Sequence, residues 1–251
     1  MKIEILGVKI NNENSLQIIA EIISRIRQKQ STFVVTPNPE MLVLARKDML
    51  FKGILNMADL AIPDGFGLIL AAKYLRLPLA ERVSGTDLIK KLIINYGDEL
   101  KIFLLGAKEG IGEQAATRLK SLNQNVKIVE IVSGGKLDVN GQFKDEEIIL
   151  ESIRASGANL LLVALGQVKQ EKWIYRNLEH LPGITAIGIG GALDFYAGRA
   201  KRAPKIFQRL GLEWLWRVLL EPKRIWRIIN AVIVFPFYTI FLPSKGEARR
   251  G

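Results

Sequence analysis

Short runs of aliphatic and β-branched residues alternate with longer amphipathic stretches along most of the chain. The short runs predict strands over residues 2–6, 32–35, 58–62, 101–105, 127–131, 160–165 and 184–189. The stretches between them predict helices over residues 15–29, 40–56, 67–75, 86–96, 109–121, 145–156 and 170–178. This alternation predicts an α/β fold, in which a mostly parallel sheet carries helices on both faces.

Polar side chains gather in the loops that follow five of the predicted strands. In Rossmann-like parallel sheets, ligands bind beyond the carboxyl ends of the strands, so a site is expected there. The loops are Thr36-Pro37-Asn38-Pro39-Glu40, Pro63-Asp64-Gly65, residues 106–112, residues 166–171 and Gly190-Gly191-Ala192-Leu193-Asp194. We expect the first, second, fourth and fifth of them to form one composite site.

Positive charge is concentrated near the C-terminus. The 251 residues hold 36 Lys+Arg and 25 Asp+Glu, a formal net charge of +11. Residues 1–198 contribute 24 basic and 22 acidic side chains, a net of +2, and residues 199–251 contribute 12 and 3, a net of +9. Three of the four tryptophans lie in that last segment. We therefore predict an α/β body over residues 1–198 and a basic, aromatic helical appendage over residues 199–251. Such an appendage suits an anionic partner, either a nucleic acid or a membrane surface.

Two residue types are scarce, which narrows the possible chemistry. The chain has no cysteine, and this excludes disulfides, thiolate metal sites, iron–sulfur clusters and a cysteine nucleophile. His180 is the single histidine, so a multi-histidine metal site or a Ser-His-Asp triad has little support.

Asp64 is the strongest candidate for a catalytic group. It follows a strand and Pro63, and Gly65 allows a tight turn that projects the carboxylate into the crevice. There it can accept a proton from an attacking hydroxyl. The alternative is a turn residue or an N-cap of the next helix. Thr36 and Asn38 have a similar pair of interpretations, as helix caps or as hydrogen-bonding partners of substrate hydroxyl or acetamido groups.

Arg82 and the glycine-rich loop that begins at Gly106 are candidates for binding phosphate. Arg82 lies in a loop before a helix that we expect Thr86 to cap, and its guanidinium can bind diphosphate oxygens bidentately. For Gly106, a turn and a contact with a nucleotide diphosphate are both open. The spacing also occurs in short-chain dehydrogenases, but the loop does not follow the first strand and no Tyr-x-x-x-Lys pair accompanies it.

Three further polar residues of the loops have both a binding and a structural interpretation. Gln167 and Gln170 can read the edge of a base or simply begin a solvated helix. Asp194 can contact a base or ribose, or cap the segment that follows it.

The appendage carries three arginines at a regular spacing. Arg217, Arg224 and Arg227 would share one face of a continuous helix, although a Glu-Pro pair between the first two can bend it. Residues 225–242 are largely apolar and are interrupted by Pro236. We expect this run to lie in a membrane interface rather than to span the bilayer, with a short spanning or re-entrant helix as the alternative. A subunit contact in a homo-oligomer is also open.

Taken together, the motifs resemble the WecG/TagA/CpsF glycosyltransferase family over nearly the whole chain. The resemblance is carried by the order and spacing of residues 36–40, 64–67, 82–87, 166–171 and 190–194. One departure is Val168, where the family usually has proline, and this change would loosen the loop that holds Gln170.

The resemblance implies an inverting, metal-independent transferase with no cofactor, for which the UDP-sugar is a substrate. In one branch of the family, N-acetylmannosamine moves from UDP to undecaprenyl-diphosphate-linked N-acetylglucosamine, which makes the linkage unit of teichoic acid. Other members use other UDP-sugars for capsule or exopolysaccharide, and that is the alternative. By resemblance, Asp64 is the general base and Thr36 and Asn38 orient the sugars. Gln170 and Asp194 lie on the nucleotide side, with Arg82 near the diphosphate.

The resemblance also implies that appendage arginines fold over the active site, the alternative being a generic cationic face at the lipid surface. The expected partners are a UDP-sugar donor, a polyprenyl-diphosphate-linked sugar acceptor and an anionic membrane, with no nucleic acid. The expected location is the cytoplasmic face of the bacterial membrane, as a peripheral protein. A nucleic-acid-binding protein is the non-enzymatic alternative, but the apolar run of the appendage contributes nothing to phosphate binding.

Overall fold

The centre of the structure, a computed structural model, is a six-stranded sheet in which every pairing is parallel and the strand order is β4-β3-β8-β7-β5-β6. The model describes residues 1–133, 135, 137, 141–200, 203–204, 206–207, 213–222 and 225–242. The strands are β3 (Thr32–Val35), β4 (Leu60–Ala61), β5 (Lys101–Gly106), β6 (Lys127–Val132), β7 (Leu160–Ala164) and β8 (Thr185–Gly188). The predicted α/β fold is confirmed.

Helices cover both faces of this sheet because its strands are apolar on both sides. Alternate residues of β7 face opposite cores, with Leu160 and Leu162 in one and Leu161 and Val163 in the other. The first core is closed by α1 (Ser15–Arg27), α5 (Gly85–Tyr96), α6 (Ile111–Leu122) and α9 (Ala192–Tyr196). The second is closed by α2 (Pro39–Lys47), α3 (Met49–Met57), α4 (Phe66–Tyr74), α7 (Glu146–Ala155) and α8 (Lys169–Asn177).

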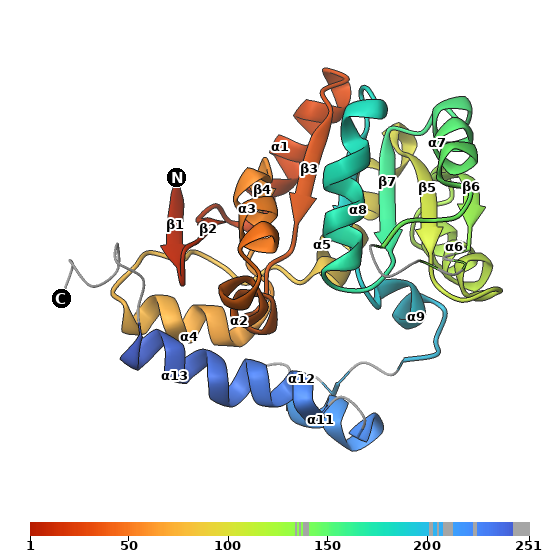
Figure 1. The fold of residues 1–251 in the computed structure, drawn as a ribbon. Coiled ribbons are helices and arrows are strands. Elements are labelled where there is room, and N and C mark those ends of the chain that lie inside the picture. Colours follow the sequence, from red (N-terminus) through yellow and green to blue (C-terminus); the bar gives the residue numbers. More distant parts are fainter. Residues whose placement is uncertain are drawn as a thin grey trace.

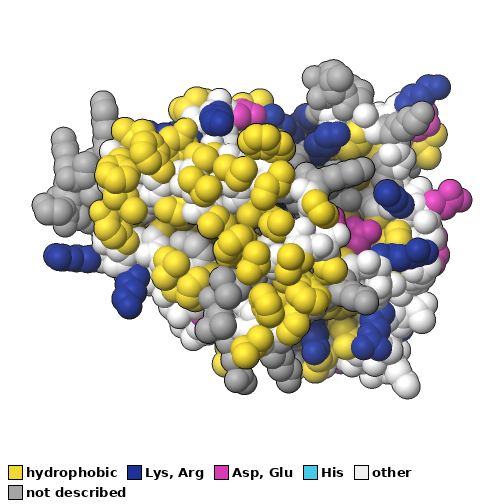
Figure 2. Space-filling view, turned by 90° about the horizontal axis from the view of Figure 1, so that it is seen from below, with side chains coloured by type: hydrophobic (Ala, Val, Ile, Leu, Met, Phe, Trp, Pro, Cys, Tyr) yellow, Lys and Arg dark blue, Asp and Glu magenta, His cyan; other side chains and the backbone are white. Residues whose placement is uncertain are grey.

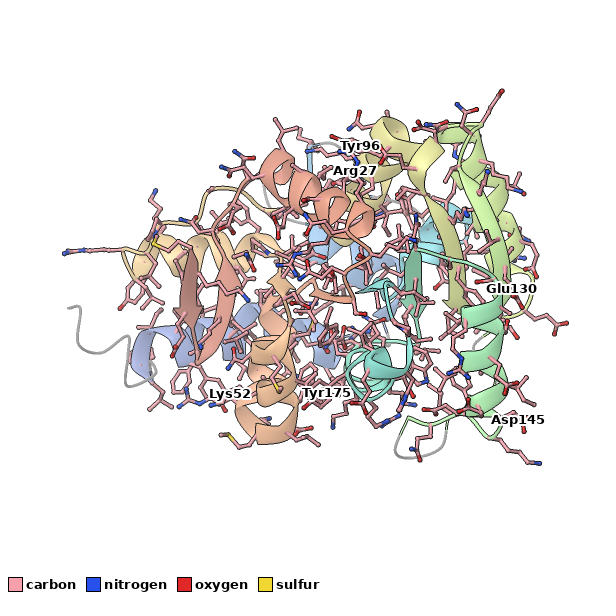
Figure 3. The ribbon with its side chains drawn as sticks, turned by 90° about the horizontal axis from the view of Figure 1, so that it is seen from above. Arg27, Lys52, Tyr96, Glu130, Asp145 and Tyr175 are labelled. Carbon is pink, nitrogen blue, oxygen red and sulfur yellow. The ribbon has the colours of Figure 1, made fainter. Side chains whose placement is uncertain are left out.

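The amino end of the sheet, opposite the expected site, is held by contacts between helices. In the view from that end, Arg27 of α1 reaches Tyr96 of α5 (Figure 3), with its guanidinium carbon 6.0 Å from the ring centroid. Arg27 also donates two 2.7 Å hydrogen bonds to Glu99. These contacts fix one helical layer without occupying the carboxyl end.

The strand predicted over residues 2–6 exists, but it does not belong to the main sheet. It is β1 (Lys2–Ile5), which pairs antiparallel with β2 (Val8–Asn11) in a separate hairpin that the pattern did not predict. Leu6 and Gly7 form the two-residue turn, and both have positive φ, 49° and 80°. Such a turn matches the twist of a hairpin, and Gly7 was its only sequence signal.

The single helix predicted over residues 40–56 is two helices, α2 and α3. Asp48 separates them in an extended conformation, with φ −119° and ψ 97°. Its carboxylate accepts a 2.9 Å hydrogen bond from the Phe51 backbone N–H and therefore caps α3. Lys172 of α8 pairs with the same carboxylate at 2.7 Å, so the break is also tied to the next layer.

The C-terminal helices lie across the carboxyl end of the sheet. Figure 1 shows α11 (Glu213–Leu220), α12 (Ile225–Ile229), the π-helical turn η4 (Asn230–Val234) and α13 (Phe235–Phe241) running below α2 and along α4. Phe235 is 1% exposed and belongs to the core of the body, and a Cβ on Gly67 would lie 3.8 Å from its ring. Arg46 stacks on Tyr238, with its guanidinium carbon 4.7 Å from the ring centroid. These contacts hold the described end of the chain against α2 and α4.

Residues 225–241 are helical throughout, and Pro236 is accommodated in the first turn of α13, directly after the π-helical turn. Within the ranges given above, no helix has both the length and the hydrophobicity needed to cross a membrane. The division into a body over residues 1–198 and an appendage over residues 199–251 stays a prediction.

Candidate active site

Four of the five polar loops lie at neighbouring strand ends. Strands β4, β3, β8 and β7 are contiguous in the sheet. The loops after them therefore lie side by side at the carboxyl end of the sheet, as the sequence predicted. The loop after β5 lies on the far side of β7. The C-terminal helices come to the same edge (Figure 1).

The loop after β3 is tied to the loops after β7 and β8. The Thr36 hydroxyl donates to the Gly188 carbonyl oxygen at 3.4 Å. Asn38 caps α2, because its Oδ1 accepts a 3.0 Å hydrogen bond from the Met41 N–H. Its Nδ2 donates to Gln167 Oε1 at 3.2 Å. The cap interpretation of Asn38 is therefore confirmed, and the same side chain also reaches into the composite site.

Asp64 is held beside this loop by its backbone. Its N–H donates to the Pro37 carbonyl oxygen at 2.8 Å, and the carbonyl oxygen of Pro63 accepts 2.9 Å from Val83 N–H. The N-cap residue of α4 is Gly65, at φ 102°, and no side chain makes the capping hydrogen bond there. Asp64 is therefore not the N-cap residue of this helix, whereas the positive φ of Gly65 agrees with the interpretation of Asp64 as a turn residue. Asp64 as a whole is partly buried.

Arg82 is paired with the C-terminal segment. Its Nη2 lies 2.9 Å from Glu213 Oε1 of α11, and both side chains are about three-quarters buried. The residue that caps the following α5 is Ser84, whose hydroxyl accepts 3.1 Å from Asp87 N–H, so the prediction of Thr86 as the cap is wrong. Ser84 lies two residues before Thr86, and its hydroxyl is the one that caps α5.

One of the three appendage arginines is brought to the composite site. Arg227 Nε donates to both carboxylate oxygens of Glu40, at 2.9 and 3.1 Å, and its Nη2 donates to Gln167 Oε1 at 3.3 Å. Arg217 lies in α11, but its side chain and the whole of Arg224 are outside the described residues. Because α11 ends at Leu220 and α12 begins at Ile225, Arg217 and Arg227 do not stand on one continuous helix.

Gln170 is a buried link between the loops after β7 and β8. It is 3% exposed; its Oε1 accepts 2.9 Å from Gly190 N–H and its Nε2 donates 2.6 Å to Glu171 Oε1. Both ends of the amide are therefore bonded within the chain. Gln167, by contrast, accepts from Asn38 and Arg227 at the rim of the site.

Glu171 belongs to the predicted loop 166–171, but sequence reasoning gave it no role. Its side chain is completely buried, and burial raises the pKa of its carboxyl from 4.5 to about 7. Its Oε2 accepts a 2.7 Å hydrogen bond from Val168 N–H. Val168 has φ 73°, a conformation that proline cannot adopt, and its N–H ties the loop to Glu171. Valine at this position therefore adds a hydrogen bond that proline could not make, in contrast to the loosening of the loop that we expected.

For Gly106 and Asp194, the remaining predicted residues, the structure describes contacts of the backbone. Gly106 has φ 109°, and a Cβ there would lie 2.6 Å from the Ala164 carbonyl, so close strand approach requires glycine. A phosphate contact by this loop stays a prediction. Asp194 lies in the short α9, where its carbonyl oxygen accepts from the N–H groups of Arg199 at 2.9 Å and Ala200 at 3.1 Å. Among the described residues, no group of three acidic or histidine side chains is arranged to hold a metal ion.

Comparison with known proteins identifies the family of the chain. The family described as "Glycosyl transferase WecG/TagA/CpsF family" matches residues 3–250. The chain therefore belongs to this family of glycosyltransferases.

Similar proteins from Staphylococcus aureus carry a specific name. The chain is 33% identical over 231 residues to the N-acetylglucosaminyldiphosphoundecaprenol N-acetyl-beta-D-mannosaminyltransferase of strain MRSA252. It is equally similar to the proteins of that name in strains NCTC 8325 / PS 47 and COL. Each alignment covers 90% of this chain and 88% of the relative.

The buried carboxyl of Glu171 predicts a pH-dependent stability. The folded-state pKa of about 7 lies above the ordinary 4.5, so the folded chain binds this proton more tightly than the unfolded chain. The contribution of the protonated Glu171 carboxyl to the free energy of unfolding is complete below pH 4.5 and is lost as the pH rises through about 7. Relative to Glu171→Gln, the wild-type unfolding free energy should fall by about 3 kcal/mol over this range. Urea titrations at both ends of the range measure the difference, and parallel pH profiles for the two proteins would contradict it.

Proposed function

We propose that the protein transfers N-acetylmannosamine from UDP to undecaprenyl-diphosphate-linked N-acetylglucosamine, with inversion and without a metal ion, in synthesis of the teichoic-acid linkage unit. The observation that carries the proposal is the meeting of Asp64, Asn38, Gln167 and Arg227 at contiguous strand ends. The names of the Staphylococcus aureus relatives support the choice of sugar and acceptor.

Asp64 is the proposed general base. Its carboxylate accepts the proton of the acceptor hydroxyl as the hydroxyl oxygen attacks the anomeric carbon of the donor, and the bond to the UDP oxygen breaks. Attack from the face opposite the leaving group inverts the anomeric configuration. The side chains of Thr36 and Asn38 orient the sugars, and Asp194 lies on the nucleotide side.

Guanidinium groups stabilise the leaving diphosphate in this proposal. Arg82 and Arg227 are each paired with a glutamate, Glu213 and Glu40 respectively. Diphosphate oxygens offer the same guanidinium groups a more highly charged partner. Both arginines therefore join the C-terminal helices to the strand ends at the point where negative charge develops.

A screen of donors tests the choice of substrate. We expect UDP release from UDP-N-acetylmannosamine to depend on the lipid-linked acceptor and to exceed release from UDP-N-acetylglucosamine, UDP-glucose and UDP-galactose. A higher rate with another UDP-sugar would assign the chain to a related pathway of capsule or exopolysaccharide synthesis.

The C-terminal helices also form the proposed contact with an anionic membrane at the cytoplasmic face. Trp226, which is 74% exposed, would insert its ring among the lipids. The protein should float with vesicles of phosphatidylglycerol and phosphatidylcholine, and Trp226→Glu should weaken this binding about 10-fold. Leu16→Glu on α1 is the matched control, because Leu16 is equally exposed. A shift of DNA without vesicle binding would favour the nucleic-acid alternative.

A further inference from the structure

Helix α4 of the body is apolar on all sides, although it lies at the molecular surface. Lys73 is the only charged residue of its sequence FGLILAAKY. A surface helix of a soluble protein ordinarily has a polar outer face. In α4 the inner face packs through Leu68, Ala71 and Ala72, whereas Phe66, Leu70 and Tyr74 remain exposed. The outer face of α4 therefore lacks a partner within the described residues.

This outer face continues onto the C-terminal helices. Helices α4 and α13 are in contact and run side by side (Figure 1). Helix α13 exposes Phe237, Ile240 and Phe241, and the turn before it exposes Ile233. Seen from the carboxyl end of the sheet, hydrophobic side chains cover a broad part of this surface (Figure 2). Two segments far apart in the sequence thus build one apolar face, which we call the α4–α13 face.

The charges around the α4–α13 face favour lipid over a second copy of the chain. Residues 65–80 and 225–242 contain no Asp or Glu, but they contain Lys73 and Arg76, together with Arg227, whose charge is paired with Glu40. Basic side chains stand at the edges of the face in Figure 2. Two copies meeting through this face would bring like charges together, whereas an anionic bilayer offers the opposite charge.

We propose that α4 is a membrane-contacting element of the body, so that an anionic bilayer is bound by α4 and α13 together. This inference rests on the proposed function, from which it takes the membrane and the lipid-linked acceptor. Asp64 lies two residues before the first residue of α4 and one before its N-cap, Gly65. Docking of α4 therefore places the proposed base at the lipid boundary, where the diphosphate of a membrane-held acceptor is found.

The variant Leu70→Glu tests the proposal. Because Leu70 is 53% exposed, a glutamate there should preserve the fold. Leu70 is also not part of the site. The matched control is Ile148→Glu on α7, where the isoleucine is 66% exposed. We expect Leu70→Glu to lower the affinity for phosphatidylglycerol-containing vesicles about 10-fold or more, and Ile148→Glu to change it less than about 2-fold. Thermal denaturation of both variants verifies folding.

The kinetic measurement uses two acceptors. With the long-chain acceptor in anionic vesicles, Leu70→Glu should raise the KM for acceptor about 10-fold, as its loss of vesicle affinity requires. With a short-chain, water-soluble analogue, kcat/KM should equal that of the wild type. Equal losses with both acceptors would mean that α4 acts through Asp64 and not through lipid, and would overturn the proposal.

Two further outcomes would also overturn it. Unchanged vesicle affinity of Leu70→Glu would remove α4 from the membrane contact. A wild-type dimer in solution that Leu70→Glu dissociates would assign the α4–α13 face to a second copy. If the wild type transfers no sugar to either acceptor, the proposed function fails, and vesicle binding still reports on α4.

Discussion

Replacing Asp64 with asparagine should lower kcat by a factor of about 10²–10⁴, the contribution typical of general-base catalysis. The amide has nearly the same shape as the carboxylate but cannot accept the proton of an attacking hydroxyl at neutral pH. The backbone contacts that hold residue 64, from its N–H to Pro37 and from Val83 N–H to Pro63, do not involve the side chain. Binding of UDP should therefore change little.

Initial rates with saturating donor and acceptor, together with calorimetric binding of UDP, measure both parts of this prediction. Asp98→Asn is the matched control, since Asp98 is an exposed aspartate of the short helix η1 (Gly97–Glu99). Normal turnover by a folded Asp64→Asn variant would exclude Asp64 as the base.

Replacing Arg227 with methionine should lower kcat about 10²-fold, because it removes a fixed donor from the site of developing diphosphate charge. Arg227 also links the C-terminal helices to α2 through Glu40, so a structural role must be separated from a catalytic one. Glu40→Gln makes this separation, since it weakens the ion pair but leaves the guanidinium in place. We expect Glu40→Gln to lower kcat by less than about 5-fold.

Rates of UDP release for Arg227→Met, Glu40→Gln and the double variant measure the two contributions. Equal losses in the two single variants would show that the ion pair, and not a contact with diphosphate, is what matters. Because Phe235 and Tyr238 also hold the C-terminal helices, neither substitution should detach them.

Much of the fold could be predicted because its strands are short apolar runs separated by helical patterns. Four loops were expected to form one site, and the strand order β4-β3-β8-β7 brings them together. The sequence did not reveal the hairpin of β1 and β2, since the turn at Leu6-Gly7 has one weak signal. The sequence also did not reveal the break between α2 and α3 at Asp48. There the ion pair with Lys172 of α8 competes with a continuous helix.

The bonding partners of the site residues could not be predicted in the same way. Glu171 stands one residue after Gln170 in an amphipathic pattern that suggests an ordinary surface glutamate, but the packing of α8 against β8 buries it. The pairing of Arg227 with Glu40 joins residues 187 positions apart and depends on how the C-terminal helices dock. Spacing along one helix could not predict this, because α11 and α12 are separate.

The proposed chemistry is based on these contacts. Carboxylate, amide, hydroxyl and guanidinium groups meet at one edge of the sheet, with the C-terminal helices and α4 beside them. This arrangement suits a transferase whose acceptor is held in a membrane while its donor comes from water.

The rate of transfer to a lipid-linked acceptor in the presence of a chelator tests the central claim most directly. The reaction contains the full chain, UDP-N-acetylmannosamine, undecaprenyl-diphosphate-linked N-acetylglucosamine in anionic vesicles, and EDTA. We predict one disaccharide-lipid formed for each UDP released, at the same rate with and without EDTA. Absence of acceptor-dependent UDP release, or a rate that requires an added divalent cation, would contradict the account.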